Sequence, residues 1–263
     1  MKVCAQLPFA GSSSRPVDPL RLRADANIGD RPQRCGICAQ RASCFPCDRS
    51  AKGEIDSGEV VITGRRVRRG ESLFRAGDAF RYLYSVRSGI FKTVRNLGDG
   101  REQITGFQMT GDMLGADAIE PRVHGFDAVA LDESRVCAIR YSGIEQFGRI
   151  VPEMHHQLRK AMSNELANQQ CVILLLGTMN AEGRVAMFLL NLSQRFKAHG
   201  YSATEFRLRM TRLEIGSYLG IKIETVSRMF SRLRNEGLIN AKREQIQILD
   251  AAGLARRARG PAH

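Results

Sequence analysis

The sequence predicts an α+β fold with three parts: an N-terminal antiparallel jelly-roll barrel, one long helix, and a C-terminal winged helix-turn-helix. Short β-rich runs separated by glycine turns fill residues 60–139, which is typical of an antiparallel sandwich. Apolar residues at helical steps follow Pro152, and two short helices flank Gly220 ahead of a hairpin-like segment. With 263 residues, 43% of them apolar, the chain is long enough to form real hydrophobic cores.

The chain is strongly basic. Lysine and arginine number 40 against 27 aspartate and glutamate, a formal net charge of +13 at pH 7. Such an excess favours a polyanionic partner, and double-stranded DNA is the partner we expect. No apolar run approaches the roughly 18 residues that a membrane span needs, and none after Lys2 suits a secretory signal. We therefore expect a cytoplasmic protein with no membrane partner.

The N-terminal region predicts an arm followed by a reactive loop. Residues 1–33 combine serines, prolines and scattered charges without periodicity, which indicates a flexible basic arm. Residues 34–50 form a cysteine-rich loop with the spacing C-x2-C-x5-C-x2-C. Its cysteines are Cys35, Cys38, Cys44 and Cys47. Thiolates are soft metal ligands, and the neighbouring arginines favour the ionised form, so the loop indicates a metal or cluster site.

Three kinds of site compete for this loop. A disulfide is disfavoured because nothing in the chain looks secreted. Structural zinc usually takes two Cys-x2-Cys pairs roughly 12 to 20 residues apart, and the interval here is shorter. An iron–sulfur cluster suits a compact run with one distant ligand, and Cys137 is the candidate for that ligand. Cys4 is expected to be a spare thiol, and Cys171 a packed small residue.

The jelly roll is expected over residues 51–150. Its strands alternate with turn signals that contain glycine. The expected strands are residues 60–62, 82–86, 90–94, 103–107 and 136–139. Cys137 therefore lies near the end of the last strand.

A dimerisation helix is expected over residues 151–180, with Pro152 in its first turn. Side chains recur there at steps of three and four, a spacing typical of a coiled-coil seam. The seam consists of Leu158, Met162, Leu166, Gln169, Ile173 and Leu176. Such a seam packs either on the barrel of its own chain or on a second copy, and we favour a homodimer. Gln169 would weaken the pairing while helping to fix its register.

Residues 181–250 predict the winged helix-turn-helix, and residues 251–263 a C-terminal tail. A first helix is expected from 181 to 198, ended by His199-Gly200. A hairpin-like segment from 238 to 249 would form the wing.

The helix-turn-helix itself has three local signals. Thr211 with Glu214 forms a capping box for a short helix, and Gly220 supplies the turn. A second helix is expected from Ile223 to Asn235. Its buried stripe should consist of Val226, Met229, Phe230 and Leu233.

The second helix of such a motif lies in the major groove and reads base edges near its N-terminus. Arg228 can bond bidentately to guanine, Glu224 can accept from cytosine, and Ser227 can serve either polar edge. Basic side chains nearby suit phosphate contacts, which position the protein without carrying sequence. The predicted DNA-binding residues are Ile223, Glu224, Thr225, Ser227, Arg228, Arg212, Lys222 and Arg232, with Arg207, Arg209 and Arg234 as further phosphate contacts.

These features together resemble a family of bacterial transcription factors. Jelly roll, long helix and the run Glu224-Thr-Val-Ser-Arg228 look like the superfamily of the cyclic-AMP receptor protein and the fumarate and nitrate reduction regulator (FNR). The likeness covers about residues 35–250. The runs similar to the FNR branch are Asn180-Ala-Glu-Gly-Arg184, Phe188-Leu-Leu-Asn-Leu-Ser-Gln-Arg-Phe196 and Glu205-Phe-Arg-Leu-Arg-Met-Thr-Arg212.

The resemblance implies an oxygen-responsive regulator with a cyclic-nucleotide-binding-like barrel and a [4Fe-4S] cluster as cofactor. It places the cluster ligands on Cys35, Cys38, Cys44 and Cys137, and Cys47 is an additional cysteine that could be an alternative ligand. It further implies a homodimer that binds a palindrome like TTGAT-N4-ATCAA without oxygen, controls genes of anaerobic or microaerobic metabolism, and contacts RNA polymerase. No catalytic residue is implied, so we do not expect an enzyme.

Alternatives remain at this point. A regulator of the same fold could respond to zinc, thiol oxidation or a small ligand, and an iron–sulfur electron-transfer protein would leave the helix-turn-helix idle. A cyclic nucleotide is not expected, because the position of the family's phosphate-binding arginine falls on His124-Gly125 and no guanidinium would face the phosphate.

Overall fold

The computed structural model describes residues 62–98, 100–148 and 152–259. The predicted arm and the cysteine-rich loop lie outside these residues, as do Cys4, Cys35, Cys38, Cys44 and Cys47. The two remaining cysteines, Cys137 and Cys171, lie within them.

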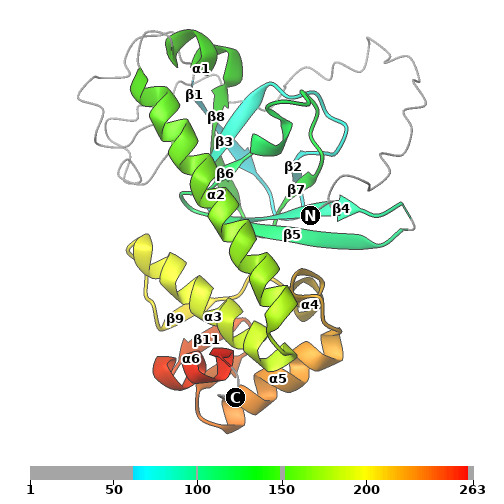
Figure 1. Ribbon diagram of the computed structural model, residues 1–263, viewed down its shortest axis with the longest axis vertical. Coiled ribbons are helices and arrows are strands. Elements are labelled where there is room, and N and C mark those ends of the chain that lie inside the picture. Colours follow the sequence, from blue (N-terminus) through cyan, green and yellow to red (C-terminus); the bar gives the residue numbers. More distant parts are fainter. Residues whose placement is uncertain (1–61, 99, 149–151, 260–263) are drawn as a thin grey trace.

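The N-terminal domain is a sandwich of two four-stranded antiparallel sheets (Figure 1). In order across the first sheet, the strands are β1 (Ile62–Val67), β8 (Ser134–Arg140), β3 (Tyr82–Ser88) and β6 (Met113–Leu114). Across the second sheet they are β2 (Ser72–Phe74), β7 (Asp127–Ala130), β4 (Ile90–Asn96) and β5 (Glu102–Met109). The predicted jelly roll is confirmed.

Four of the longer strands were predicted from the sequence, whereas β1 overlaps the strand predicted at 60–62 only at Ile62 and the shortest strands were missed. The segments predicted at 82–86, 90–94, 103–107 and 136–139 fall within β3, β4, β5 and β8. By contrast, β2, β6 and β7 contain three, two and four residues. Runs this short do not show a recognisable alternation of apolar and polar side chains.

Strand β8 is buried on both of its faces. Val136 and Ala138 pack with Phe91 of the opposite sheet, between the two sheets. Successive side chains of a strand point to opposite faces, and Cys137 and Ile139 accordingly belong to a different cluster of buried side chains. Apolar side chains therefore fill the space between the two sheets. Cys137 points to the outer face of its sheet, toward the helices that follow the sandwich.

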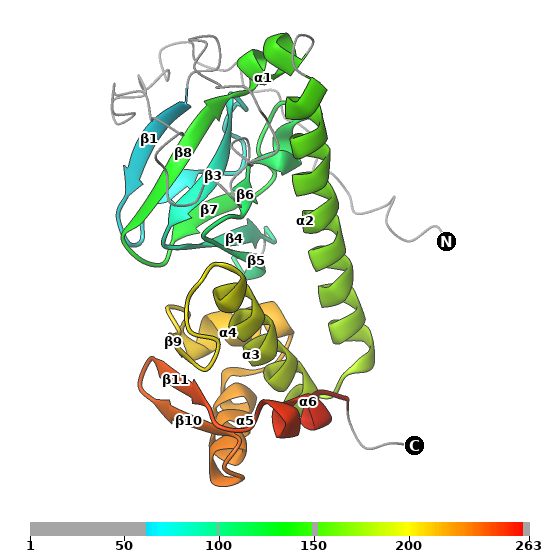
Figure 2. The ribbon, with the colours of Figure 1, turned by 90° about the vertical axis from the view of Figure 1, so that its left-hand side faces the viewer.

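Two helices follow the sandwich. The short α1 (Tyr141–Gly148) precedes α2 (Pro152–Thr178), whose 27 residues extend for about 40 Å. Figure 2 shows α2 running along the barrel and on to the C-terminal domain. Near its start Leu158 packs into the cluster that contains Cys137, and near its end Leu175 packs into the C-terminal core.

The C-terminal domain contains the predicted winged helix-turn-helix. Its helices are α3 (Ala181–Ala198), α4 (Arg212–Leu219), α5 (Ile223–Asn235) and α6 (Ala251–Arg259). Its antiparallel sheet has the order β10 (Ile239–Lys242), β11 (Gln245–Ile248) and β9 (Glu205–Arg207). Neither β9 nor α6, which lies within the predicted C-terminal tail, was expected from the sequence. Both are held by packing: Phe206 of β9 and Leu254 of α6 are buried in the domain core.

Across the part of the chain that the structure describes, no helix combines the length and apolar character that crossing a lipid bilayer requires.

Candidate functional site

The helix-turn-helix starts with the predicted capping box. The Thr211 hydroxyl accepts a hydrogen bond from the Glu214 N–H at 3.2 Å, and the Thr211 N–H donates to the Glu214 carboxylate at 2.8 Å. Helix α4 ends at Gly220, whose φ of +62° is the left-handed conformation that glycine adopts without strain. Both local predictions are confirmed.

Helix α4 lies very close to the turn that leads into α5. A Cβ placed on Gly216 would lie 2.6 Å from the carbonyl oxygen of Ile221 and 3.4 Å from a methyl carbon of Val226. Glycine at this position therefore lets the turn, and the Val226 side chain of α5, pack directly on the backbone of α4.

The recognition helix α5 presents one buried and one exposed face. Val226, Phe230 and Leu233 are buried, and Met229 packs against the same core. The predicted stripe is therefore confirmed. Because these residues recur at steps of three and four, the residues between them face solvent.

The predicted base-reading residues lie on this exposed face. Glu224, Ser227 and Arg228 are exposed, and among the described residues their side chains have no hydrogen-bonding or ionic partner. Ile223, the first helical residue, is 39% exposed, and Thr225 is half-buried. The first two turns of α5 thus offer an acceptor, a hydroxyl and a guanidinium that are all exposed to a ligand.

The predicted phosphate contacts divide into available and engaged side chains. Lys222, the N-cap residue of α5, is exposed. Arg212 is half-buried, and its guanidinium carbon lies 3.2 Å from the ring centroid of Phe230. Burial lowers the pKa of Arg212 to about 10. Arg212 therefore helps to pack α4 against α5, a role that sequence reasoning missed.

Arg232 is also engaged within the protein. It pairs with Glu182 of α3 at 2.9 Å and with Glu236 at 3.1 Å. Arg257 of α6 pairs with the same two carboxylates, at 3.4 Å and 2.9 Å. The network joins α3, α5 and α6. Its Arg232–Glu236 pair is local, four residues apart along the helix, but Glu182 and Arg257 lie far from that pair in the sequence, so their part in the network has no local signal.

A third arginine closes the junction between the long helix and the DNA-binding domain. Arg184 of α3 donates hydrogen bonds to the carbonyl oxygens of Leu176 at 2.8 Å and Met179 at 2.9 Å, at the end of α2. It also donates to the carbonyl of Leu219, at the end of α4, at 3.0 Å. One guanidinium thus satisfies carbonyls at two helix ends, where intrahelical partners are lacking.

The second site of interest surrounds Cys137, which is 6% exposed. Its cluster includes Ile139 of the same strand, Ile144 of α1 and Leu158 of α2. Opposite Cys137, strand β1 has Gly64. Gly64 is the third residue of β1, which begins at Ile62, the first residue that the structure describes.

Both the helix-turn-helix and the barrel that contains Cys137 lie in regions that match known protein families. Residues 183–257 match the family described as Crp-like helix-turn-helix domain, and residues 64–149 match the cyclic nucleotide-binding domain. The chain is 38% identical to transcriptional activator protein FnrA of Stutzerimonas stutzeri, over 88% of this chain and 94% of that protein. It is 40% identical to the fumarate and nitrate reduction regulatory protein of Vibrio cholerae, over 84% and 88% of the two chains.

The chain belongs to the FNR family of transcription regulators.

The solved structures agree with this assignment. FixK2 from Bradyrhizobium japonicum superposes with a TM-score of 0.68 at 31% identity, over 74% of this chain and 96% of that one. The family resemblance predicted from sequence is confirmed. In this FNR-family protein, residues 183–257 form the DNA-binding helix-turn-helix domain of a transcription regulator.

Only part of the predicted metal site of this FNR-family chain lies within the described residues. The described residues contain no group of three or more cysteine, histidine, aspartate or glutamate side chains that could hold a metal ion. Three of the four predicted ligands lie outside those residues, so the described part of the site is Cys137 alone. Its thiol is of the kind that holds an iron–sulfur cluster, and it lies between β1 and the helices α1 and α2.

The barrel position predicted to lack an arginine contains a buried histidine. His124 is 4% exposed, and its ring stacks on Phe74 with centroids 3.8 Å apart. Its Nδ1 lies 3.7 Å from a carboxylate oxygen of Asp117. A stacked imidazole fills this place, and the absence of a cyclic-nucleotide ligand remains a prediction.

The residues of the predicted dimer seam fall into two groups, one packed within the chain and one exposed. Leu158 is 7% exposed, and Leu176 packs against the core of the DNA-binding domain, so both serve the fold of their own chain. Between them Met162, Leu166 and Ile173 are 40%, 58% and 70% exposed in the single chain. Gln169 is exposed and donates to Glu165 at 3.1 Å, within the helix. Cys171 is exposed, contrary to the prediction that it is packed.

Proposed function

We propose that this FNR-family regulator responds to oxygen through a [4Fe-4S] cluster and binds DNA as a homodimer when oxygen is absent. Cys35, Cys38 and Cys44 would hold the cluster together with Cys137, and the bound cluster would supply iron–sulfur chemistry that oxygen destroys. The observation that carries the proposal is the position of Cys137, which shares a buried cluster with Leu158 of α2.

The path from Cys137 to the dimer is short. Leu158 connects the Cys137 cluster to the start of α2, and the next turns of the same helix expose Met162, Leu166 and Ile173. A row of exposed large apolar side chains indicates a surface that a partner covers, and a second copy of the helix fits the coiled-coil spacing. Disturbance around Cys137 would thus reach the dimer interface through α2.

The DNA site follows from the dimer. Two recognition helices related by a two-fold axis bind two half-sites about one helical turn apart. We propose a palindrome like TTGAT-N4-ATCAA, with Arg228, Glu224 and Ser227 reading base edges and Lys222 contacting a phosphate. Bound in this way, the regulator would control genes of anaerobic or microaerobic metabolism through contact with RNA polymerase.

Cysteine substitution tests the cluster assignment. Cys44→Ser should remove the visible absorption of the cluster and abolish DNA binding without oxygen, because one of four thiolates is lost. Cys171→Ser is the matched control, since this exposed thiol on α2 is not a predicted ligand, and it should change little. Retention of the cluster in Cys44→Ser together with its loss in Cys47→Ser would show that Cys47 is the third ligand instead.

A further inference from the structure

The barrel and the DNA-binding domain share one hydrophobic core. Phe107 of β5 lies 5.0 Å from Tyr218 of α4 and 6.1 Å from Phe188 of α3, measured between ring centroids. Val94 and Ile104 of the β4–β5 hairpin belong to the same cluster of buried side chains. These contacts dock α3 and α4 against the hairpin, as Figure 2 shows.

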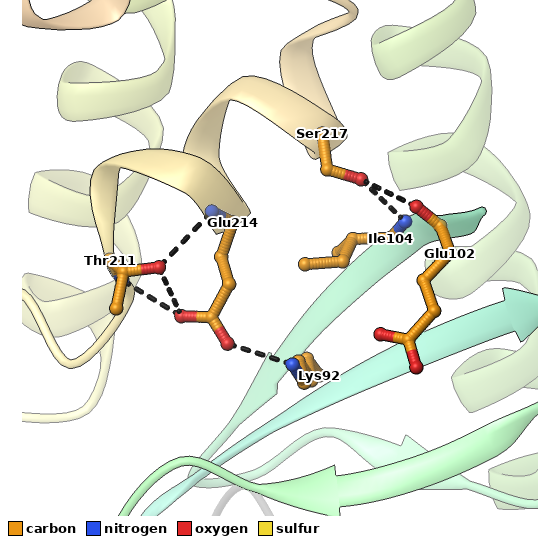
Figure 3. Close-up of polar contacts among 6 residues, drawn as sticks. All are labelled: Lys92, Glu102, Ile104, Thr211, Glu214 and Ser217. Atoms are coloured by element: carbon orange, nitrogen blue, oxygen red, sulfur yellow. Dashed lines mark hydrogen bonds and ion pairs between the residues drawn. The ribbon is translucent and has the colours of Figure 1, made fainter. Parts of the chain in front are cut away.

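Polar contacts fix the docked α4 at two points (Figure 3). Lys92 Nζ lies 2.8 Å from Glu214 Oε1, and the two side chains are only 18% and 15% exposed. The Ser217 hydroxyl accepts from the Ile104 N–H at 3.0 Å and donates to the Glu102 carbonyl at 3.3 Å. Because β5 is an edge strand, α4 satisfies backbone groups that no neighbouring strand could pair.

The two anchors restrict how α4 can turn. Glu214 is shared between the capping box of α4 and the ion pair with Lys92. Ser217 follows three residues later, on the same face of the helix. Anchors almost one helical turn apart oppose rotation of α4 about its axis. Helix α5 is tied to α4 by the tight turn at Gly220, by the packing of Val226 at Gly216 and by the contact of Arg212 with Phe230.

We infer that Lys92 and Ser217 are positioning residues for DNA binding: through α4 they hold the recognition helix α5 at a fixed angle to the barrel. In a dimer joined by α2, that angle sets the distance between the two recognition helices. The inference rests on the proposed function, since only a two-fold site requires a fixed distance, of roughly 34–36 Å. Leu175 and Arg184 hold the end of α2 against the DNA-binding domain, and the hairpin contacts add a second attachment, between the barrel and α4.

The test uses the full chain, purified without oxygen, and three DNA duplexes. One contains the palindrome with its four-base-pair spacer, one has the spacer lengthened, and one has a single half-site. Lys92→Met removes the ammonium and keeps an apolar chain of similar length. Lys92→Arg keeps the charge, and Lys197→Met is the matched control on an exposed position of α3.

We expect Lys92→Met to bind the palindrome roughly tenfold more weakly, a loss within the usual range of coupling between sites. Its affinity for the single half-site should not change, and its preference for the native spacer should fall. Lys92→Arg and Lys197→Met should behave like the wild type. If Lys92→Met fails to fold, Ser217→Ala, which removes two hydrogen bonds, is measured in its place.

Two results would contradict the inference, and they are distinguishable. An unchanged spacer preference in Lys92→Met, or in its substitute Ser217→Ala, would overturn the positioning role and leave the proposed function intact. A wild-type protein that binds the palindrome no better than one half-site would overturn the proposed dimer, and the positioning role with it.

Discussion

Single residues of α5 differ in whether the protein itself uses them. Arg228 projects from the exposed face and has no ionic partner among the described residues, whereas Arg232, four residues on, pairs with Glu182 and Glu236. Helical periodicity predicted the direction of both side chains. It could not predict the pairing with Glu182, which lies fifty positions earlier in the sequence and meets Arg232 only in the folded domain.

Arg228→Ala should cost about 1 to 3 kcal/mol of binding free energy at the specific site and little on unrelated DNA, because a bidentate contact to guanine carries sequence information. Arg234→Ala is the control on the same helix: its exposed guanidinium is a predicted phosphate contact, and its loss should weaken both complexes alike. Fluorescence anisotropy with the two DNAs gives both affinities. Equal losses in the Arg228 variant would argue against base reading.

The ionisation of Glu214 should make the stability of the folded protein depend on pH. Burial alone would raise the pKa of Glu214, but hydrogen bonds from Lys92 and Thr211 hold it below its usual value of 4.5. Since the folded-state pKa is lowered, the carboxylate stabilises the protein above about pH 4.5, and this contribution is lost as the pH falls through the folded-state pKa. Urea midpoints should therefore separate wild type from Glu214→Gln at neutral pH and converge in acid. A difference that is constant with pH would rule out this carboxylate as the source.

At the scale of elements, helices were predicted better than short strands. The capping box at Thr211 and the turn at Gly220 are local, so residues three to nine apart reveal them. Strand β9 has three residues and depends on its pairing with β11. Helix α6 depends on packing against α3, where Leu254 is fully buried. Elements that exist through distant contacts leave only a weak pattern in the sequence.

Arg184 is the residue on which the junction of α2, α3 and α4 depends. Arg184→Lys keeps the charge, but an ammonium on a flexible stem cannot reproduce the planar fork that bonds three carbonyls. We expect about 1 to 3 kcal/mol of lost stability for each carbonyl left buried without a donor, read as a lower urea midpoint with an unchanged slope. Arg66→Lys, at a 73% exposed barrel position, should have no effect. Equal midpoints for both variants would refute the junction role.

At the scale of the whole molecule, the three-part order was predictable, but the contact between the parts was not. Lys92 and Glu214 are 122 positions apart, and nothing near either residue signals the other. The seam on α2 was half predictable: the spacing located the apolar residues, but only the fold shows that Leu158 is covered by its own barrel while Leu166 is not.

The exposed part of the seam should control assembly. Leu166→Glu places a charge where we expect the partner helix, so the mass in solution should fall from dimer to monomer, with loss of palindrome binding. Leu97→Glu, on a leucine of the β4–β5 loop that is 50% exposed against 58% for Leu166, is the control and should leave the dimer intact. Light scattering measures both. A dimer that persists in Leu166→Glu would move the interface elsewhere.

The measurement that tests the central claim most directly is iron and acid-labile sulfide, determined with the visible spectrum on protein purified without oxygen and then exposed to air. We predict about four iron and four sulfide per chain, with bleaching in air accompanied by loss of the dimer and of palindrome binding. Zinc or no metal, with DNA binding indifferent to air, would contradict the account and leave an FNR-family regulator that responds to a different signal.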